Sequence, residues 1–211
     1  MSAETTTQPY VPLEAQTAHN DELTGLPNLK AFNPRLDRLI ERFPGQFGLL
    51  LIDLDDLKPI NDGPGGHAAG NEYIKNAVEV INSNIRSGED EDRQQDILFR
   101  GKTYRTGGDE FVVLLAGARS EKDVEIVKER LQKALHTANI PASMGGRAHK
   151  PDENRSDYLK DIDKLMYENK LKRKQTQYEY ELSNSSLVKR TAHKAGNQLL
   201  KFSGIKKPVV R

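Results

Sequence analysis

Arg105-Thr106-Gly107-Gly108-Asp109-Glu110-Phe111 leads directly into an apolar run at residues 112–115. Two adjacent glycines allow a tight turn and a close approach of the backbone to a ligand. The apolar run has the length and composition of a buried strand. We therefore predict a hairpin whose tip carries the carboxylates of Asp109 and Glu110. Adjacent carboxylates repel each other, so this tip is either solvated or neutralised by a cation, and hard divalent metals prefer oxygen ligands.

A second acidic strand end lies upstream, where the apolar residues 49–52 are followed by Asp53, Leu54, Asp55 and Asp56. Such runs are typical of fully buried strands, and ligand sites in α/β sheets collect where strands end. If the two strands are neighbours, Asp53, Asp109 and Glu110 converge on one metal site. Carboxylates that hold Mg²⁺ against nucleotide phosphates are the apparatus of phosphoryl or nucleotidyl transfer.

With these motifs, the chain resembles a GGDEF domain of the diguanylate cyclase family. Its motifs occur in the expected order over roughly residues 18–175, at 21–28 (Asp-Glu-Leu-Thr-Gly-Leu-Pro-Asn), 53–71, 107–111, 143–145 (Ser-Met-Gly) and 163–170. The resemblance implies an α/β fold with a mainly antiparallel central sheet flanked by helices, similar to the palm of nucleotide cyclases and polymerases. It also implies a bacterial second-messenger enzyme that condenses two GTP into cyclic di-GMP and releases pyrophosphate.

The resemblance further implies roles for individual residues. The metal, Mg²⁺ or Mn²⁺, would be held by Asp53, the backbone at Leu54 and Asp109. Catalysis would involve Glu110, Asp109 and Lys58, with Glu110 helping to deprotonate the attacking 3′-hydroxyl. Nucleotide contacts would come from Asn61, Asn71, Lys58, Lys170, Lys174, Gly107 and Gly108. One half-site holds one nucleotide, so forming two phosphodiester bonds requires a homodimer, at least transiently.

The sequence departs from the family pattern at the base site. Asn71 stands where an Asp is usual, and Gly63-Pro64-Gly65 makes the preceding loop one residue longer. Guanine offers two parallel donors that a carboxylate accepts together, whereas an amide presents one donor and one acceptor and fits adenine better. A mismatched buried donor pair costs roughly 1–3 kcal/mol. GTP is therefore the first expected substrate, with ATP or a mixed dinucleotide as the alternative.

Two further departures concern phosphate binding and feedback. Lys174 replaces an arginine, which keeps the charge but loses bidentate geometry. The Arg-x-x-Asp inhibitory site common in the family is absent at its usual spacing, which falls on Leu98 and Gly101. Arg93 and Asp96 have the right identities five residues too early, so they form a candidate inhibitory site that a longer hairpin could bring into reach.

Length and composition set limits on the other functions. The 211 residues predict one domain at 18–175, with a polar flexible leader at 1–17 and a basic extension at 176–211. A formal net charge of +1 gives no bias toward DNA. No apolar stretch approaches the roughly 20 residues of a membrane span, so we expect a cytoplasmic protein without membrane contact. The chain has no cysteine. A catalytically inactive nucleotide sensor and a partner-binding scaffold remain alternatives.

Apolar periodicity predicts the main elements. We expect helices at 29–42, 72–85, 121–137 and 157–174, and strands at 49–54, 97–100, 102–106 and 140–147. The glycines and prolines within residues 58–71 predict a loop. The extension could be a short docking helix, a partner-binding segment or a disordered tail. No histidine has the spacing of a metal ligand.

Overall fold

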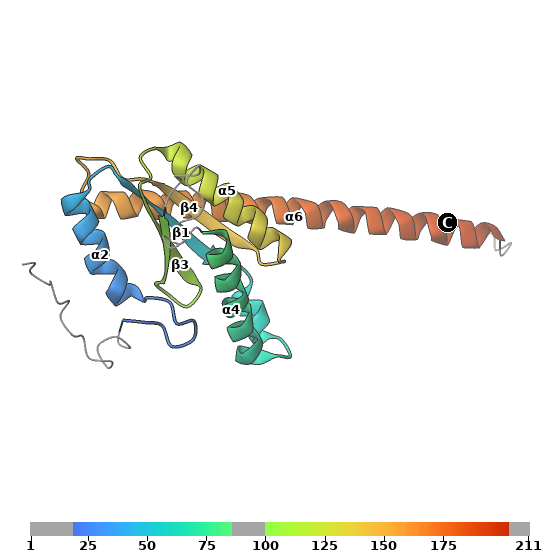
Figure 1. Cartoon of the computed structure of the whole chain (residues 1–211). Helices are drawn as coiled ribbons and strands as arrows, with labels where there is room; N and C mark the ends of the chain where they lie inside the picture. Colours follow the sequence, from blue (N-terminus) through green and yellow to red (C-terminus); the bar gives the residue numbers. More distant parts are fainter. Residues whose placement is uncertain (1–18, 86–99, 203–211) are drawn as a thin grey trace, which may run out of the picture. The chain divides into compact units, whose positions relative to one another are not determined.

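The computed structural model describes residues 19–85 and 100–202, with the backbone alone at Arg100 and at 185–202. It divides into two compact units, Met1–Asn169 and Lys170–Arg211. The first unit is built on a four-stranded sheet in the order β2-β3-β1-β4, in which every neighbouring pair is antiparallel (Figure 1). Its strands are β1 (Phe47–Leu54), β2 (Arg100–Arg105), β3 (Glu110–Ala116) and β4 (Ala142–Ala148). The predicted fold, an antiparallel sheet flanked by helices, is confirmed.

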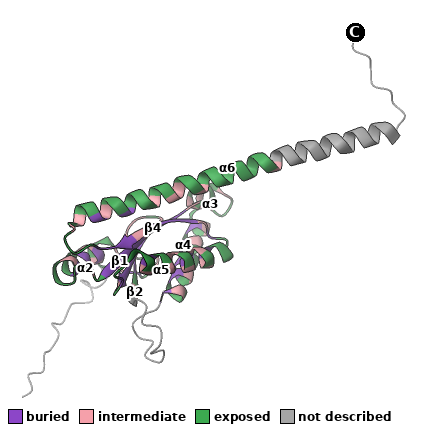
Figure 2. Ribbon diagram, turned by 90° about the horizontal axis from the view of Figure 1, so that it is seen from above, coloured by how far each residue is buried: buried purple, intermediate pink, exposed green. Residues whose placement is uncertain are grey.

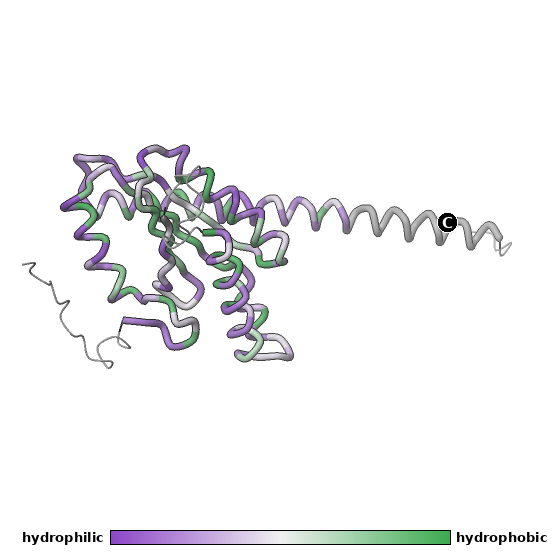
Figure 3. The backbone as a smooth tube through the Cα atoms, viewed as in Figure 1, coloured by the Kyte–Doolittle hydropathy of each residue, from purple (hydrophilic) through white to green (hydrophobic). Residues whose placement is uncertain are grey.

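The two central strands bury side chains on both faces, as their continuous apolar runs predict. One face, with Leu50, Ile52 and Val113, packs against α4 (Gly66–Asn84) and α5 (Glu121–Thr137). The other face, with Phe47 and Leu49, packs against α2 (Leu29–Arg42) and the first turns of α6 (Arg155–Phe202). Figure 3 shows hydrophobic residues gathered at the sheet, with hydrophilic residues along the helices that cover it.

Side-chain caps fix where two of these helices begin. The Asn28 side chain accepts hydrogen bonds from the first-turn amides of α2. Ser120 and Asp123 form a reciprocal capping box at the start of α5. Both helices have the bounds that periodicity predicted.

The loop predicted at residues 58–71 is largely wrong. A short helix α3 (Leu57–Asp62) occupies its beginning, and α4 begins at Gly66 rather than at residue 72. Pro59 is tolerated because it lies in the first turn of α3, where an amide has no intrahelical partner. Pro64 falls in the connection between the two helices. The glycines and prolines therefore define a tight corner between helices.

Strand β2 also differs from its prediction. It runs through Gly101 without a break, whereas two strands separated at that residue were expected; residues 97–99 lie outside the described part. A side chain at Gly101 would collide with Ile85, which ends α4. The glycine is thus needed for close packing of the α4 end on β2. Strand β4 begins at Ala142, two residues later than predicted.

Strand β4 lies at the edge of the sheet and packs closely on α6. A Cβ at Gly145 would lie 2.7 Å from the carbonyl oxygen of Ile162 and still nearer the backbone of Met166. The Asn169 side chain accepts a hydrogen bond of 3.0 Å from the backbone amide of Met144. These contacts cover an edge that would otherwise expose unpaired backbone groups.

The second unit contains the remainder of α6, which runs as one helix to Phe202. The extension is therefore helical over residues 176–202, longer than the short helix that was one of the three alternatives. Its described side chains are mostly exposed (Figure 2). Within the described residues, no helix is both long and apolar enough to cross a membrane.

Candidate nucleotide and metal site

Asp53 and Glu110 face each other across the paired ends of β1 and β3. The register sets Asp53 opposite Glu110, so both side chains project from the same face of the sheet, the one covered by α2 and α6. Asp53 is buried, with 7% of its surface exposed, and Glu110 is exposed. The Leu54 amide donates a hydrogen bond of 3.0 Å to the Asp109 carbonyl, which holds the two strand ends together. The two acidic strand ends are therefore neighbours, as predicted.

The glycine turn folds back over Glu110. The amides of Thr106 and Gly107 donate hydrogen bonds to the Glu110 carbonyl, at 3.0 and 3.3 Å. A Cβ at Gly107 would lie 2.7 Å from the carboxylate oxygen Oε2 of Glu110. A side chain there would displace the carboxylate, whereas one at Gly108 would enter open space. Gly107 therefore keeps room for the acidic group.

Arg105 joins this turn to the loop at residues 21–28. Its guanidinium donates hydrogen bonds of 2.8 Å to Asp21 Oδ1 and 2.6 Å to the Gly108 carbonyl. The Arg105 amide donates to the Pro27 carbonyl at 2.9 Å. Sequence reasoning missed this arginine because its carboxylate partner lies 84 residues away.

The loop at 21–28 is itself ordered around Asp21. The Thr24 amide and hydroxyl both donate to Asp21 Oδ1, at 2.9 and 2.6 Å. Partial burial alone would raise the pKa of the Asp21 carboxyl, but the hydrogen bonds from Thr24 and Arg105 and the charge of Arg105 hold this pKa below its usual value. The carboxylate is therefore ionised at neutral pH and available to Arg105.

The helical corner brings together the two residues predicted to contact the base. The Asn61 side chain of α3 lies against Gly70 of α4, at the position a Cβ would occupy. Gly70 is buried, and Asn71 follows it in an exposed position. Lys58 is exposed on α3. The close approach of the two helices, permitted by Gly70, places Asn61 beside the backbone that carries Asn71.

Asp55 anchors the end of β1 to the neighbouring elements. The Ser143 hydroxyl lies 3.0 and 3.2 Å from the two Asp55 carboxylate oxygens, and the Tyr73 hydroxyl donates to the Asp55 carbonyl at 2.9 Å. These bonds tie the strand end to β4 and to α4. Neither Ser143 nor Tyr73 was identified as a site residue from the sequence.

The side chains at this edge suit a divalent cation that is shared with a nucleotide. Among the described residues, no group of three or more His, Cys, Asp or Glu side chains is arranged to hold a metal by itself. Mg²⁺ is usually bound by one or two carboxylates together with substrate phosphates and water. The expected convergence of Asp53, Asp109 and Glu110 is therefore not found among the described residues, and the register brings together only Asp53 and Glu110. These two carboxylates supply hard oxygen donors of that kind. The residues present therefore fit a Mg²⁺–nucleotide complex better than a permanent metal cage.

Four predicted site residues are not part of the site in the first unit. Lys170 and Lys174 belong to the second unit, and their predicted contacts with phosphate stay predictions. Arg93 and Asp96, the candidate inhibitory pair, lie outside the described residues.

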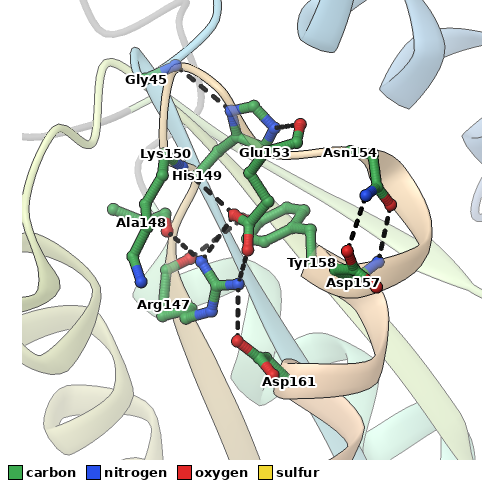
Figure 4. A network of polar contacts seen from close by, with 10 residues as sticks. All are labelled: Gly45, Arg147, Ala148, His149, Lys150, Glu153, Asn154, Asp157, Tyr158 and Asp161. Carbon is green, nitrogen blue, oxygen red and sulfur yellow. Dashed lines mark hydrogen bonds and ion pairs between the residues drawn. The ribbon is translucent and has the colours of Figure 1, made fainter.

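A second polar network lies where β4 ends, on the side away from Ser143 (Figure 4). Buried Arg147 pairs with Glu153 and donates a hydrogen bond of 3.0 Å to Asp161, and its guanidinium carbon lies 4.8 Å from the Tyr158 ring centre. His149 stacks on Phe47 with ring centres 4.7 Å apart. These residues join the β4 end to α6, and we assign them a structural role.

Comparison with known proteins identifies the family of the chain. The family model described as "Diguanylate cyclase, GGDEF domain" matches residues 18–176. The chain belongs to the GGDEF diguanylate cyclase family. It is 32% identical over 163 residues to the bifunctional diguanylate cyclase/cyclic di-GMP phosphodiesterase MucR of Pseudomonas aeruginosa, a match that covers 72% of this chain and 22% of MucR.

Other relatives agree with this assignment. The probable diguanylate cyclase DgcI of Escherichia coli is 33% identical over 129 residues, which cover 61% of this chain and 26% of that protein. The chain thus matches about a quarter of the length of these two relatives. Among solved structures, the GGDEF domain of TpbB from Pseudomonas aeruginosa aligns with a TM-score of 0.57 and 29% identity, covering 73% of this chain and 90% of that one. Diguanylate cyclase SiaD from the same species aligns with a TM-score of 0.63 and 25% identity, covering 74% and 60%.

Proposed function

We propose that this protein is an active diguanylate cyclase that condenses two GTP into cyclic di-GMP, with its cyclase domain at residues 18–175. The observation that supports it most is the pairing of Asp53 with Glu110 at adjacent strand ends, beside a turn held by Arg105. A carboxylate pair of this kind suits the Mg²⁺–nucleotide complex that the reaction requires. Family membership supports the same reaction class.

In this proposal each predicted site residue has a defined role. Asp53, the Leu54 carbonyl and Asp109 hold Mg²⁺ or Mn²⁺ against the triphosphate, and Gly107, Gly108, Lys58, Lys170 and Lys174 contact its phosphates. The bound cation supplies charge neutralisation and polarisation at the α-phosphate. Asn61 and Asn71 contact the base.

The reaction joins nucleotides on two protomers. Glu110 accepts the proton of the 3′-hydroxyl as that oxygen attacks the α-phosphorus of the second nucleotide. A new P–O bond forms, the bond to the β-phosphate oxygen breaks, and pyrophosphate leaves with its electron pair. The 3′-hydroxyl of the second nucleotide then attacks the α-phosphorus of the first in the same way, which closes the cyclic dinucleotide. Catalysis therefore requires two facing protomers, at least transiently.

The proposal is tested by incubating the purified chain with GTP, ATP or both, in the presence of Mg²⁺ or Mn²⁺, and resolving the products by mass. Cyclic di-GMP from GTP, lost in Asp53→Asn, is the expected result. ATP-containing products would keep the reaction class and revise the base preference.

A non-catalytic nucleotide sensor is the second candidate, favoured by Asn71 in the base site and by the absence of a three-carboxylate group among the described residues. Binding of nucleotide or cyclic di-GMP without any product would support the sensor and contradict the cyclase. Absence of both binding and product would favour a scaffold.

A further inference from the structure

The second unit carries an aligned row of exposed apolar side chains. Leu171, Tyr178 and Leu182 of α6 are 49%, 66% and 50% exposed. At about 100° per residue, spacings of seven and four place them within an arc of about 40° on the helix surface. A fourth exposed apolar side chain of this unit, Tyr180 at 67%, lies on the opposite side of the helix. The other three lie in one row, and a row of large apolar residues marks a contact surface. We call these three residues the α6 stripe.

The sequence repeats around this stripe. Tyr-Glu-Asn-Lys-Leu at residues 167–171 recurs as Tyr-Glu-Tyr-Glu-Leu at residues 178–182, eleven residues later. An eleven-residue repeat nearly matches three turns of an α-helix, so it keeps equivalent positions on one side with little drift. This period favours a helix that packs lengthwise against another helix.

Charged residues of opposite sign border the stripe on both flanks. Lys172 and Glu179 lie seven residues apart on one flank, and Lys174 and Glu181 lie seven apart on the other. All four are exposed. Glu179 and Glu181 each accept a hydrogen bond from a glutamine in the same helix, Gln175 and Gln177. A carboxylate has about four acceptor positions, so both can accept a further donor.

This arrangement is complementary to itself when reversed. In an antiparallel helix pair, like flanks meet, so Lys172 would approach the partner's Glu179 and Lys174 the partner's Glu181. The same pairing, centred between Thr176 and Gln177, sets Leu171 opposite the partner's Leu182. In a parallel pair, opposite flanks meet with an offset of about five residues, so Lys174 would approach the partner's Glu179, but Lys172 and Glu181 would have no counterpart among these four residues. The antiparallel pair alone satisfies all four charges.

We propose that the α6 stripe binds the α6 stripe of a second copy of this chain, in antiparallel orientation. The four bordering charges sum to zero, and each flank carries both signs. An entirely acidic or entirely basic partner would therefore meet a repulsive residue on each flank, whereas a second copy meets none. This contact lies within the second unit, and it is tested without nucleotide because Lys174 is also a proposed phosphate contact.

Charge reversal tests whether the charged flanks of two copies pair. The dissociation constant of the dimer is measured on the full chain without nucleotide, by light scattering or sedimentation over a concentration series. Lys172→Glu with Lys174→Glu should weaken the dimer about tenfold or more, because every flank contact becomes repulsive. Adding Glu179→Lys and Glu181→Lys should restore it to within about threefold of wild type. Lysine and glutamate have similar helix propensities, so the helix itself is preserved.

Two results would overturn the proposal. A quadruple variant as weak as the double variant would show that these flanks do not meet, and a wild-type chain that stays monomeric over the whole series would remove the dimer. Failure here leaves the cyclase reaction to be judged by its own products.

Disulfide trapping provides an independent check of direction, because the chain has no native cysteine. Positions 171 and 182 are about 16 Å apart along one helix, too far to bond within a chain. Under oxidation, Leu171→Cys with Leu182→Cys should form a covalent dimer, and Leu171→Cys alone should not. Efficient trapping of the single variant would indicate a parallel pair and contradict the proposal.

Discussion

Arg105 is the residue on which the acidic turn depends most directly. Its guanidinium spans from the Asp21 carboxylate to the Gly108 carbonyl, and so joins the acidic turn to the loop at residues 21–28. Hydrogen bonds of this charge-assisted kind are among the stronger ones in proteins. We infer that Arg105 positions Asp109 and Glu110 without contacting substrate.

Arg105→Lys should lower cyclase activity about tenfold to a hundredfold, because lysine cannot span both acceptors and a small displacement of reacting groups costs this much. Asp21→Asn should reproduce part of the loss. The measurement is initial-rate kinetics with GTP, with thermal unfolding to confirm the fold. Arg119→Lys, at an exposed position, is the control and should leave the rate unchanged. Full activity in Arg105→Lys would show that the turn is held by other contacts.

Asn71 carries the prediction on base choice. Asn71→Asp should raise the preference for GTP over ATP about tenfold to a hundredfold, because a carboxylate accepts both guanine donors. Competition between the two nucleotides, read as product masses, measures it. Asn76→Asp, exposed on the same helix, should have no effect. Unchanged selectivity in Asn71→Asp would mean that the longer loop aligns another residue with the base.

His149 provides a test in the structural network. Burial, with the nearby charge of Arg147, lowers the pKa of this imidazole, although the carbonyl and the charge of Glu153 oppose the shift. The unfolded chain therefore binds a proton first, near pH 6.5, and stability is lost as the pH falls below that value. Glu153, whose pKa is also lowered, acts in a separate window near pH 4 and below.

The free energy of unfolding in urea should accordingly fall between pH 7.5 and 5.5 in the wild type and fall less in His149→Gln. His136→Gln, at an exposed histidine, should keep the wild-type slope. An identical slope in all three proteins would contradict a buried neutral His149.

Single residues illustrate what sequence alone can resolve. The approach of Asp53 to Glu110 was predictable because each ends an apolar run, and adjacent buried strands bring such ends together. The hydrogen bond from Arg105 to Asp21 and the one from Ser143 to Asp55 were not predictable, because each joins segments that are distant in sequence. Long-range pairs of polar side chains leave no local pattern.

Among the elements, the approach of β4 to α6 gives the sharpest stability prediction. Gly145→Ala should destabilise the protein by about 2 kcal/mol, because the new methyl group overlaps the backbone of α6. Gly108→Ala is the matched control, since it adds the same atom in open space and should change stability by less than about 0.5 kcal/mol. Urea denaturation measures both, and equal stability of the two variants would contradict this packing.

Helices with strong local signals were predicted well, and the α3–α4 corner was not. Asn28 and Ser120 mark helix starts by capping, so α2 and α5 had correct bounds. At residues 58–71, glycine and proline were interpreted as a loop, because a breaker in a first turn has the same local signature as one in a loop. Tertiary contact between Asn61 and Gly70 distinguishes the two cases.

At the scale of the molecule, the chain combines a GGDEF domain with a long helical extension. The fold class of the domain follows from ordered motifs and was predicted, whereas the α3–α4 corner and the course of β2 were not. The extension lies outside those motifs, and its composition alone permitted three structures. Leu171, Tyr178 and Leu182 form one row with charged flanks only because α6 is helical there, so the sequence alone did not reveal this surface.

The central claim is that Asp53, at the end of β1, holds a divalent cation beside the nucleotide. The most direct test is a titration of the full chain with Mn²⁺ in the presence of a non-hydrolysable GTP analogue. Electron paramagnetic resonance measures how much Mn²⁺ is bound. Asp53→Asn should weaken Mn²⁺ binding at least about tenfold. Asp56→Asn, three residues away at an exposed position that makes no cap hydrogen bond, should bind like the wild type. Equal Mn²⁺ affinity in Asp53→Asn and wild type would contradict the account.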